Sequence, residues 1–362
     1  MARTIFIIII ALLPKCLMAD NDTITSAKQP FRQTRKNVYK TVKEINNIDT
    51  TYIEPEHYNF TAMLQNTNTY EVYHLRSNSG QTITFAPKPT VKIGPYFGWR
   101  WIFAGYTFDI SHLAGKTRQE YDLSIYSSKI GIDIFYRKSG DDYRIKNINL
   151  NNDINTDNIK NTPFKGLHVG ITGASIYYIF NHRKFSYPAA FSQSTRQKIS
   201  CGTPLIGIGY TRHTLDFDYQ QFINTINQKI PQYQQQADTA LMFRKLKYTD
   251  ISVSGGYAYN LCLTPNLLLA ASLSIALGYK HTSGEADNEK FNLRNFATNN
   301  ILIDGAARLG IVWNNDKHFA GASLILHSYN SHKPQLTTNN IFGNLNIYTG
   351  IKFGKRKNKT KH

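Results

Sequence analysis

The feature that most constrains the fold of this chain is an alternation of apolar and polar residues along unusually long segments. Between Leu267 and Lys280 every odd position is apolar or aromatic, whereas the even positions include Ser272, Ser274 and Gly278. A period of two residues is typical of a β-strand. This segment would extend for ~45 Å at ~3.3 Å per residue, whereas most strands contain only about 5–6 residues.

The same alternation recurs in three other segments, Asp250–Leu261, Ile303–Trp313 and Asn344–Phe353. Each has an apolar face with aromatic residues and a second face of Ser, Gly, Asn and isolated charges. In a soluble sandwich the apolar face would pack on a second sheet. In a transmembrane barrel it would face lipid, and the polar face would line the lumen.

The first nineteen residues predict export. Arg3 precedes the short apolar run Ile5–Leu13, and small residues precede Asp20, as in a secretory signal peptide. Cys16 suggests a lipoprotein as an alternative, which the neighbouring Lys15 disfavours. No other segment approaches the ~18 consecutive apolar residues of a membrane helix. Export, strand length and the aromatic residues at strand ends favour the barrel.

We therefore predict an all-β fold, a transmembrane antiparallel up-and-down β-barrel of about twelve strands, within roughly ten to fourteen, in a bacterial outer membrane. The expected division is a signal peptide (1–19), a periplasmic N-terminal segment (20–56), the barrel (57–354) and a basic disordered tail (355–362). The expected strands are 57–77, 81–99, 101–110, 120–137, 165–181, 184–195, 202–216, 247–261, 267–281, 298–313, 318–330 and 341–354.

The turns and loops agree with this topology. Cys262–Asn266 and Asn314–Lys317 are short polar turns, whereas Asp216–Lys247 and Thr282–Asn300 are long polar connections. Outer-membrane barrels have short turns on the periplasmic side and long loops outside. The short turns are therefore expected in the periplasm.

The charge of the chain is strongly positive, +18 in all. The signal peptide carries Arg3 and Lys15 and no acid, so its removal leaves +16. An exported protein rarely meets nucleic acid, so we expect outer-membrane lipid and lipopolysaccharide as partners, together with an unidentified protein.

Strand parity predicts which charges face the lumen. It places five basic and four acidic residues inward: Lys92, Arg137, Lys280, Arg308, Lys352, Asp109, Asp133, Asp250 and Asp304. Tyr96, Phe135 and Tyr348 would also point inward and fill space. Opposite charges in a narrow lumen should pair, because an unpaired buried charge is costly. The sequence therefore predicts a mostly occluded, ion-paired interior.

A polar run from Ser192 to Lys198 separates two strand-like segments and contains no acid to balance Arg196 and Lys198. The simplest interpretation is a water-exposed turn between the expected strands 184–195 and 202–216. The alternative is a constriction of the lumen or a lipid-phosphate site that uses the two cations.

Other chemistry has little support. Cys201 and Cys262 are too far apart in sequence for a zinc motif, although a disulfide is possible if the strands that they border pair. Ser323 and His327 share a polar strand face, but four residues of strand separate them by ~13 Å, too far for a direct hydrogen bond. We therefore expect no catalytic residue, no cofactor and no metal site.

Four stretches carry a resemblance to a known family: Asp49–Leu64, Lys92–Ile110, Tyr121–Ile145 and Phe185–Tyr210. They resemble an uncharacterised family of exported Bacteroidota proteins, catalogued as domain of unknown function 4421. The resemblance covers nearly the whole mature chain and implies a bacterial outer-membrane barrel. It brings no activity, substrate or catalytic residue. The basic tail after Phe353 departs from the terminal aromatic residue of a usual barrel end.

Three classes of function remain open. The favoured one is a structural, interaction or assembly scaffold with a mostly occluded lumen. The alternatives are a passive porin-like channel for small solutes and, less favoured, a lipid-modifying enzyme. The candidate luminal or anion-contact residues are Arg196, Lys198, Asp304, Arg308, Lys280 and Lys352.

Overall fold

The computed structural model describes residues 48–99, 102–105, 108–110, 118–139, 141–150, 155–230, 245–284, 301–332 and 336–356. The chain divides into two units, Met1–Asn46 and Asn47–His362, and the described residues all belong to the second. The expected signal peptide, most of the N-terminal segment and the tail from residue 357 lie outside the described residues. None of the helices in the described ranges is long and apolar enough to cross a membrane.

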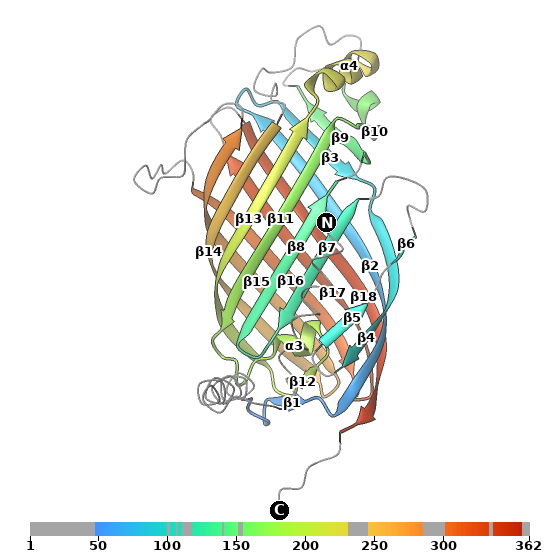
Figure 1. The fold of residues 1–362 in the computed structure, drawn as a ribbon, viewed down its shortest axis with the longest axis vertical. Helices are drawn as coiled ribbons and strands as arrows, with labels where there is room; N and C mark the ends of the chain where they lie inside the picture. The colour runs from blue at the N-terminus through green and yellow to red at the C-terminus, as the bar shows by residue number, and fades with distance from the viewer. Residues whose placement is uncertain are drawn as a thin grey trace, which may run out of the picture. The chain divides into compact units, whose positions relative to one another are not determined.

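Sixteen strands of the described residues form one antiparallel sheet, and all of them except β3 (Thr82–Pro87), β9 (Tyr143–Asn149) and β10 (Thr162–Pro163) build a curved barrel wall (Figure 1). The C-terminal β18 pairs with the N-terminal β2 from Leu336–Ser77 to Lys355–Tyr58. The wall consists of β2 (Tyr58–Ser77), β4 (Thr90–Trp99), β5 (Ile102–Gly105), β6 (Phe108–Asp109), β7 (Gln119–Tyr126), β8 (Ile130–Lys138), β11 (Leu167–Ile179), β13 (Cys201–Phe217), β14 (Lys245–Thr264), β15 (Leu267–Gly284), β16 (Ile301–Asn314), β17 (His318–His332) and β18 (Leu336–Lys355).

Both β5 and β6 pair with β4 and take the place of a single wall strand. Counted in this way, the wall has about twelve strands. The prediction of an antiparallel barrel of about this size is confirmed.

Side chains of the wall alternate between its two faces. In β13, Ile206, Ile208 and Tyr210 are exposed, whereas Thr211 and His213 are buried. The outer face is thus apolar and the inner face polar, the reverse of a soluble protein. This is the pattern of a wall that faces lipid, and it gives the predicted all-β transmembrane class.

Two expected strands are wrong in extent because alternation continues through a break. The expected strand 120–137 is a hairpin of β7 and β8, and Ser127 makes its turn by hydrogen bonds with Ile130. The expected strand 81–99 breaks at Pro87–Pro89 into β3 (Thr82–Pro87) and β4. Proline lacks the N–H that a continuous ladder needs, and β3 leaves the wall to pair with β9 (Tyr143–Asn149).

The expected strand 184–195 is wrong in type. Ser186 caps the short helix α3 (Tyr187–Phe191) by accepting a hydrogen bond from the N–H of Ala189, and Pro188 lies in its first turn. Serine as N-cap and proline at the helix start favour a helix over a strand. The chain then forms β12 (Thr195–Gln197), which pairs with β1 (Ile53–Pro55) outside the main sheet.

The two ends of the barrel differ. We call the end with the short connections 127–129, 265–266 and 315–317 the turn end, and the opposite end the loop end. At the turn end lie α3, β12 and β1, whereas α4 (Tyr219–Lys229), β9 and β10 (Thr162–Pro163) lie at the loop end (Figure 1). The expected long connection 216–247 therefore begins with a helix.

A hydrophobic core covers the loop end. It joins α4, β3, β9 and the 3-10 helix η1 (Asp157–Ile159) to inward residues of the wall. Phe222 and Ile226 of α4 are fully buried there, and Phe85 of β3 stacks on Phe164 at 5.3 Å. We call this group of elements the cap. Smaller buried clusters around α3 fill the turn end.

The packing inside the wall generates a first prediction. A Cβ atom at Gly173 would overlap the ring of Phe135, which is held in a buried aromatic cluster. We expect Gly173→Ala to lower the free energy of unfolding by about 1–3 kcal/mol. Gly255→Ala is the matched control because a Cβ there meets nothing within 4 Å. Urea unfolding in lipid measures both, and equal stability of the two variants would contradict the packing.

Candidate functional site

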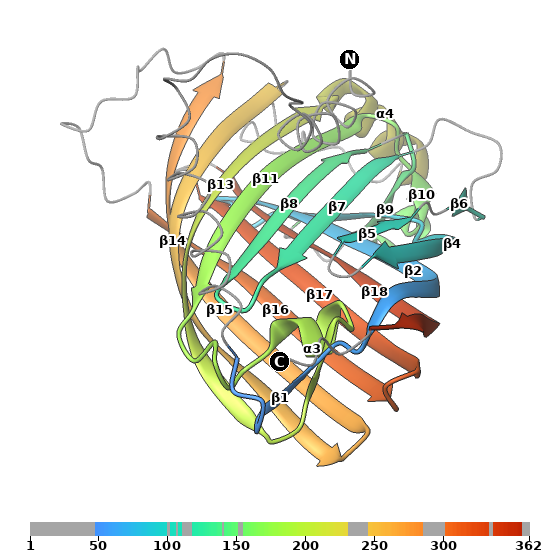
Figure 2. The same cartoon turned by 60° about the horizontal axis from the view of Figure 1, so that its bottom comes forward.

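The segment between β11 and β13 folds back into the turn end of the barrel, where α3 lies inside the curved wall (Figure 2). We call residues 186–197 the plug. The Tyr187 hydroxyl lies 2.6 Å from the Ser272 hydroxyl of β15, and the Gln193 amide donates to the Tyr348 hydroxyl of β18 at 2.9 Å. Within the run Ser192–Lys198, Gln193 and Gln197 are buried against the wall, whereas Lys198 is exposed, so the run is in part luminal and in part a solvent-exposed connection.

Gln197 connects the plug to three other parts of the chain. Its buried side-chain amide donates to the backbone oxygens of Lys184 at 2.6 Å and Tyr52 at 3.3 Å. Its side-chain oxygen accepts from the N–H of Ser186 at 3.0 Å and from the Asn260 amide of β14 at 3.2 Å. A buried glutamine satisfied at both ends holds the plug in one position.

The residues immediately before β2 form ion pairs with the plug and with the wall at the turn end. Arg196 forms an ion pair with Glu54 of β1 and lies 3.4 Å from the side chain of Asn266. Glu56 forms a buried ion pair with Lys352 of β18, with 2.6 Å between Nζ and Oε2. We call residues 48–57 the strap, because they link the plug to the wall.

Further into the lumen, buried charges pair across the barrel. Arg308 of β16 pairs with Asp133 of β8, two strands that are not neighbours in the sheet. Asp133 also accepts a 2.6 Å hydrogen bond from Ser124. The Arg308 guanidinium lies 5.3 Å from the ring centroid of Tyr177. The carboxylate of Asp133 and the ring of Tyr177 offset part of the cost of burying this guanidinium.

A second group lies along β14, β15 and β16. Lys280 is in register with Asp250, and its ammonium is 4.0 Å from Asp304 and 5.0 Å from the ring centroid of Tyr248. All three charged residues are buried. The group therefore places two carboxylates and one cation together inside the wall.

A third group joins the two edges of the wall. Lys92 of β4 and Glu120 of β7 form a 2.9 Å ion pair, although these strands share no backbone pairing within the described residues. Arg118 pairs with Glu71 of β2, with Glu120 at 3.3 Å and with Asp142 at 3.3 Å. Side-chain ion pairs thus bridge β7 to β4 and β2.

This third group extends into the cap through Tyr143 of β9. The Tyr143 hydroxyl donates to Glu71 at 2.8 Å, and its ring lies 5.3 Å from the Arg118 guanidinium. Burial, reinforced by the Glu71 carboxylate, raises the pKa of Tyr143 well above its usual value. The phenol therefore stays protonated and continues to donate to Glu71.

The structure separates the six candidate residues into two sets. Lys280, Asp304, Arg308 and Lys352 are buried in the lumen, each near an opposite charge. Arg196 faces Glu54 of the strap, and Lys198 donates to the backbone oxygen of Thr50 at 3.2 Å.

Four partners in this interior were absent from the sequence-based set: Glu56, Glu71, Arg118 and Glu120. Parity along the strand 57–77 would have placed Glu71 inward beside Thr69 and Tyr73. Glu120 lies in β7, which was expected to continue into β8 as one strand, so parity could not place it inward. Arg118 and Glu56 precede their strands, where alternation gives no signal.

The other residues considered for catalysis, disulfide formation or metal binding do not form a reactive group. Ser323 is 3.4 Å from the Asn346 amide, whereas His327 stacks against Phe342 at 5.3 Å. Cys201 is in register with Asn260 of β14, so the expected pairing of the strands that carry the two cysteines is confirmed. Both Cys201 and Cys262 are free thiols. Within the described ranges, His, Cys, Asp and Glu form no group of three that could hold a metal.

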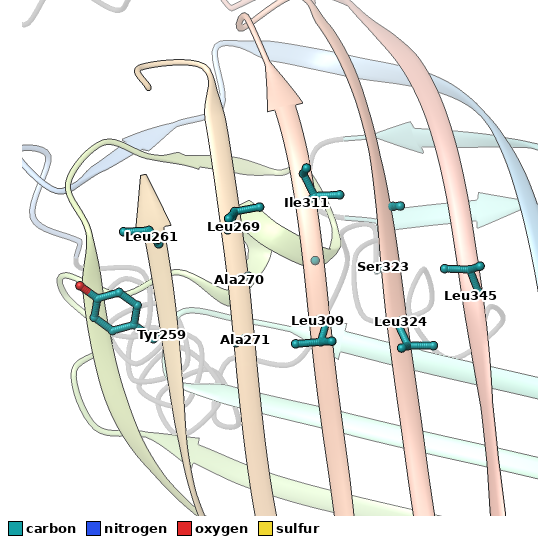
Figure 3. A pocket seen from close by; sticks show the side chains of 12 residues that line it. Tyr259, Leu261, Leu269, Ala270, Ala271, Leu309, Ile311, Ser323, Leu324 and Leu345 are labelled. Atoms are coloured by element: carbon teal, nitrogen blue, oxygen red, sulfur yellow. The ribbon is translucent and has the colours of Figure 1, made fainter. Parts of the chain in front are cut away.

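One hollow lies on the outer face of the wall over β14–β18, away from the charged interior (Figure 3). Its volume is about 520 Å³ and its lining is apolar. The lining residues are Tyr259, Leu261, Leu269, Ala270, Ala271, Leu309, Gly310, Ile311, Ala322, Ser323, Leu324 and Leu345. It adds no reactive group to the site.

The fold and interior define an antiparallel β-barrel with an apolar outer face, which holds the plug at one end and the cap at the other. The chain belongs to the family described as Domain of unknown function (DUF4421), which matches residues 47–353. None of the curated proteins compared with the chain is a match.

Solved structures with a similar fold include the outer membrane protease OmpT from Escherichia coli, 6% identical, which covers 82% of this chain and 97% of that chain with a TM-score of 0.35. The translocator domain of autotransporter NalP from Neisseria meningitidis is 8% identical, with coverages of 89% and 96% and a TM-score of 0.32. The outer membrane protein OprG from Pseudomonas aeruginosa is 9% identical, and the match covers 83% of this chain and 98% of that chain with a TM-score of 0.24.

The pair across the lumen generates the second prediction. Asp133→Asn leaves Arg308 buried without its carboxylate, and we expect it to lower the free energy of unfolding by about 3–5 kcal/mol. The double variant Asp133→Asn with Arg308→Met should recover part of that loss, because no uncompensated charge remains. Urea unfolding in lipid vesicles measures both. A double variant as unstable as the sum of the two single variants would show that the two residues do not interact.

Proposed function

We propose that this protein is an outer-membrane barrel that works as a structural or interaction scaffold and does not conduct solutes. The single observation that carries the proposal is the filling of the lumen at three levels. The plug occupies the turn end, buried ion pairs occupy the middle, and the cap core occupies the loop end.

The energetics of opening support this proposal. A continuous path for solutes would require the plug to leave Ser272, Asn260 and Tyr348. It would also require separation of Arg308 from Asp133, and loss of one partner from a buried pair costs about 3–5 kcal/mol. Barrels of about eight strands are filled by side chains and those of sixteen or more leave a channel. A wall of about twelve strands needs such extra elements to close.

A channel is the second candidate, and the plug is the observation that favours it. The plug is one connection held largely by neutral hydrogen bonds, so its displacement would open the turn end without unfolding the wall. The enzyme candidate has no such support, since Ser323 and His327 face different partners.

The third prediction is electrical. Purified full-length mature protein in a planar bilayer should show no stable conductance steps, whereas a general porin in the same membrane should conduct. A variant in which residues 187–197 are replaced by a Gly-Ser linker should also stay silent, because the ion pairs and the cap remain. Conductance in this variant alone would favour the gated channel. Large anion-selective steps from the wild type would establish a porin and overturn the scaffold.

A further inference from the structure

Along the strands towards the loop end, the outward side chains of the wall change from apolar to hydroxyl-bearing and basic. β7, β8, β11, β13 and β14 lie side by side on the side shown in Figure 1. Strand register aligns Ile134, Ala174, Tyr210 and Ile251 in one outward row. The next row towards the loop end contains Tyr136, Thr172, Arg212 and Thr249, and the row after it Lys138, Gly170, Thr214 and Lys247.

These rows form a boundary between an apolar surface and a basic one. Tyr210 and Ile251 are exposed apolar or aromatic residues, as Ile208 and Val253 are one row below. Above them Tyr121 and Tyr136 are exposed, with ring centroids 6.1 Å apart, as in an aromatic belt at a lipid interface. The hydroxyl and basic rows therefore lie at the level of lipid headgroups.

The two rows above the boundary carry Lys138, Arg212 and Lys247 and hold no acidic residue. Among the described residues of these five strands, an outward carboxylate occurs only in the row at the strand ends, where Asp216 is in register with His168 and Lys245. Asp141 of the β8–β9 connection is 3.8 Å from His168. The three cations thus point outward at headgroup level without a carboxylate in their own rows.

The arrangement suits a phosphorylated headgroup. Arg212 and Lys247 are diagonal neighbours on adjacent strands, since Arg212 is in register with Thr249, so their Cβ atoms lie ~7–8 Å apart. A guanidinium can bind a phosphate with two hydrogen bonds, and a neighbouring ammonium adds a second charge. Lys138 lies three strand spacings from Lys247 in the same row, ~14 Å away.

We propose that Arg212, Lys247 and Lys138 form a binding site for the diphosphorylated sugar headgroup of lipid A in the outer leaflet. Arg212 and Lys247 hold one phosphate, and Lys138 takes the phosphate at the other end of the disaccharide. The threonine hydroxyls of the same rows face the sugar, and the acyl chains lie on the rows of Ile208, Tyr210 and Ile251. The inference rests on the proposed outer-membrane location, with the long connections at the outside.

The test measures lipid binding by native mass spectrometry of the full mature chain in detergent. The probe is purified diphosphoryl lipid A, with lipid A stripped of both phosphates and phosphatidylglycerol as comparison ligands. We expect tight binding of diphosphoryl lipid A only. Arg212→Gln with Lys247→Gln should weaken it roughly twenty-fivefold, since each cation at an anionic membrane surface contributes about fivefold. Arg212→Lys should give a smaller loss of affinity, because lysine keeps the positive charge but lacks the paired N–H donors of the guanidinium.

The matched control is Lys160→Gln with Lys165→Gln, two exposed lysines near η1 and β10. It removes the same charge and should bind lipid A as the wild type does. An equal loss in this control would show that net charge alone attracts the lipid. Unchanged binding in the Arg212 and Lys247 variant would overturn the site, and equal affinity for phosphatidylglycerol would overturn the choice of lipid A. The conductance measurement does not depend on lipid affinity, so either proposal can fail alone.

Discussion

A charge inside a narrow barrel is stable only beside an opposite charge, and this requirement organises the interior of the protein. Arg308 of β16 reaches across the lumen to Asp133 of β8, and Arg137 of β8 donates to Asn344 of β18 at 3.0 Å. These contacts join strands that are distant in the sheet. The polar face that marks a transmembrane strand in the sequence therefore also ties opposite sides of the wall together.

The same requirement explains how the chain before β2 becomes part of the barrel. Lys352 lies near the end of the last strand and is buried, and its partner Glu56 belongs to the strap. The strap also pairs with β12 through Ile53 and Gln197. The buried charge of Lys352 thus holds the strap in place through Glu56, and the strap holds the plug in place through the pairing of β1 with β12. Closure of the turn end combines this chain of contacts with the apolar clusters around α3.

Alternation in the sequence predicted the wall well, because a residue facing lipid must be apolar whatever its neighbours are. It failed where a segment leaves the wall. Ser186–Phe191 is aromatic and apolar enough to resemble a strand, yet its serine cap and Pro188 begin a helix of which all residues but Phe191 are buried. The pairing of charges was also beyond the sequence. Parity places Arg308 inward, but it does not say which acid becomes its partner. The curvature of the sheet brings Arg308 close to Asp133, which is far away in the sequence.

Pairing inside the barrel also decides where the net charge of the chain can act. The luminal cations are engaged with carboxylates of the wall, the strap and the cap edge, as Lys352 is with Glu56 and Lys92 with Glu120. The excess of basic residues must then lie mainly on outward and terminal surfaces, where anionic partners can reach it. On the wall, one part of this surface is the pair of rows that carries Arg212 and Lys247, directly above the apolar band. In the arrangement that we propose, the paired interior closes the lumen and the remaining charge faces the membrane surface.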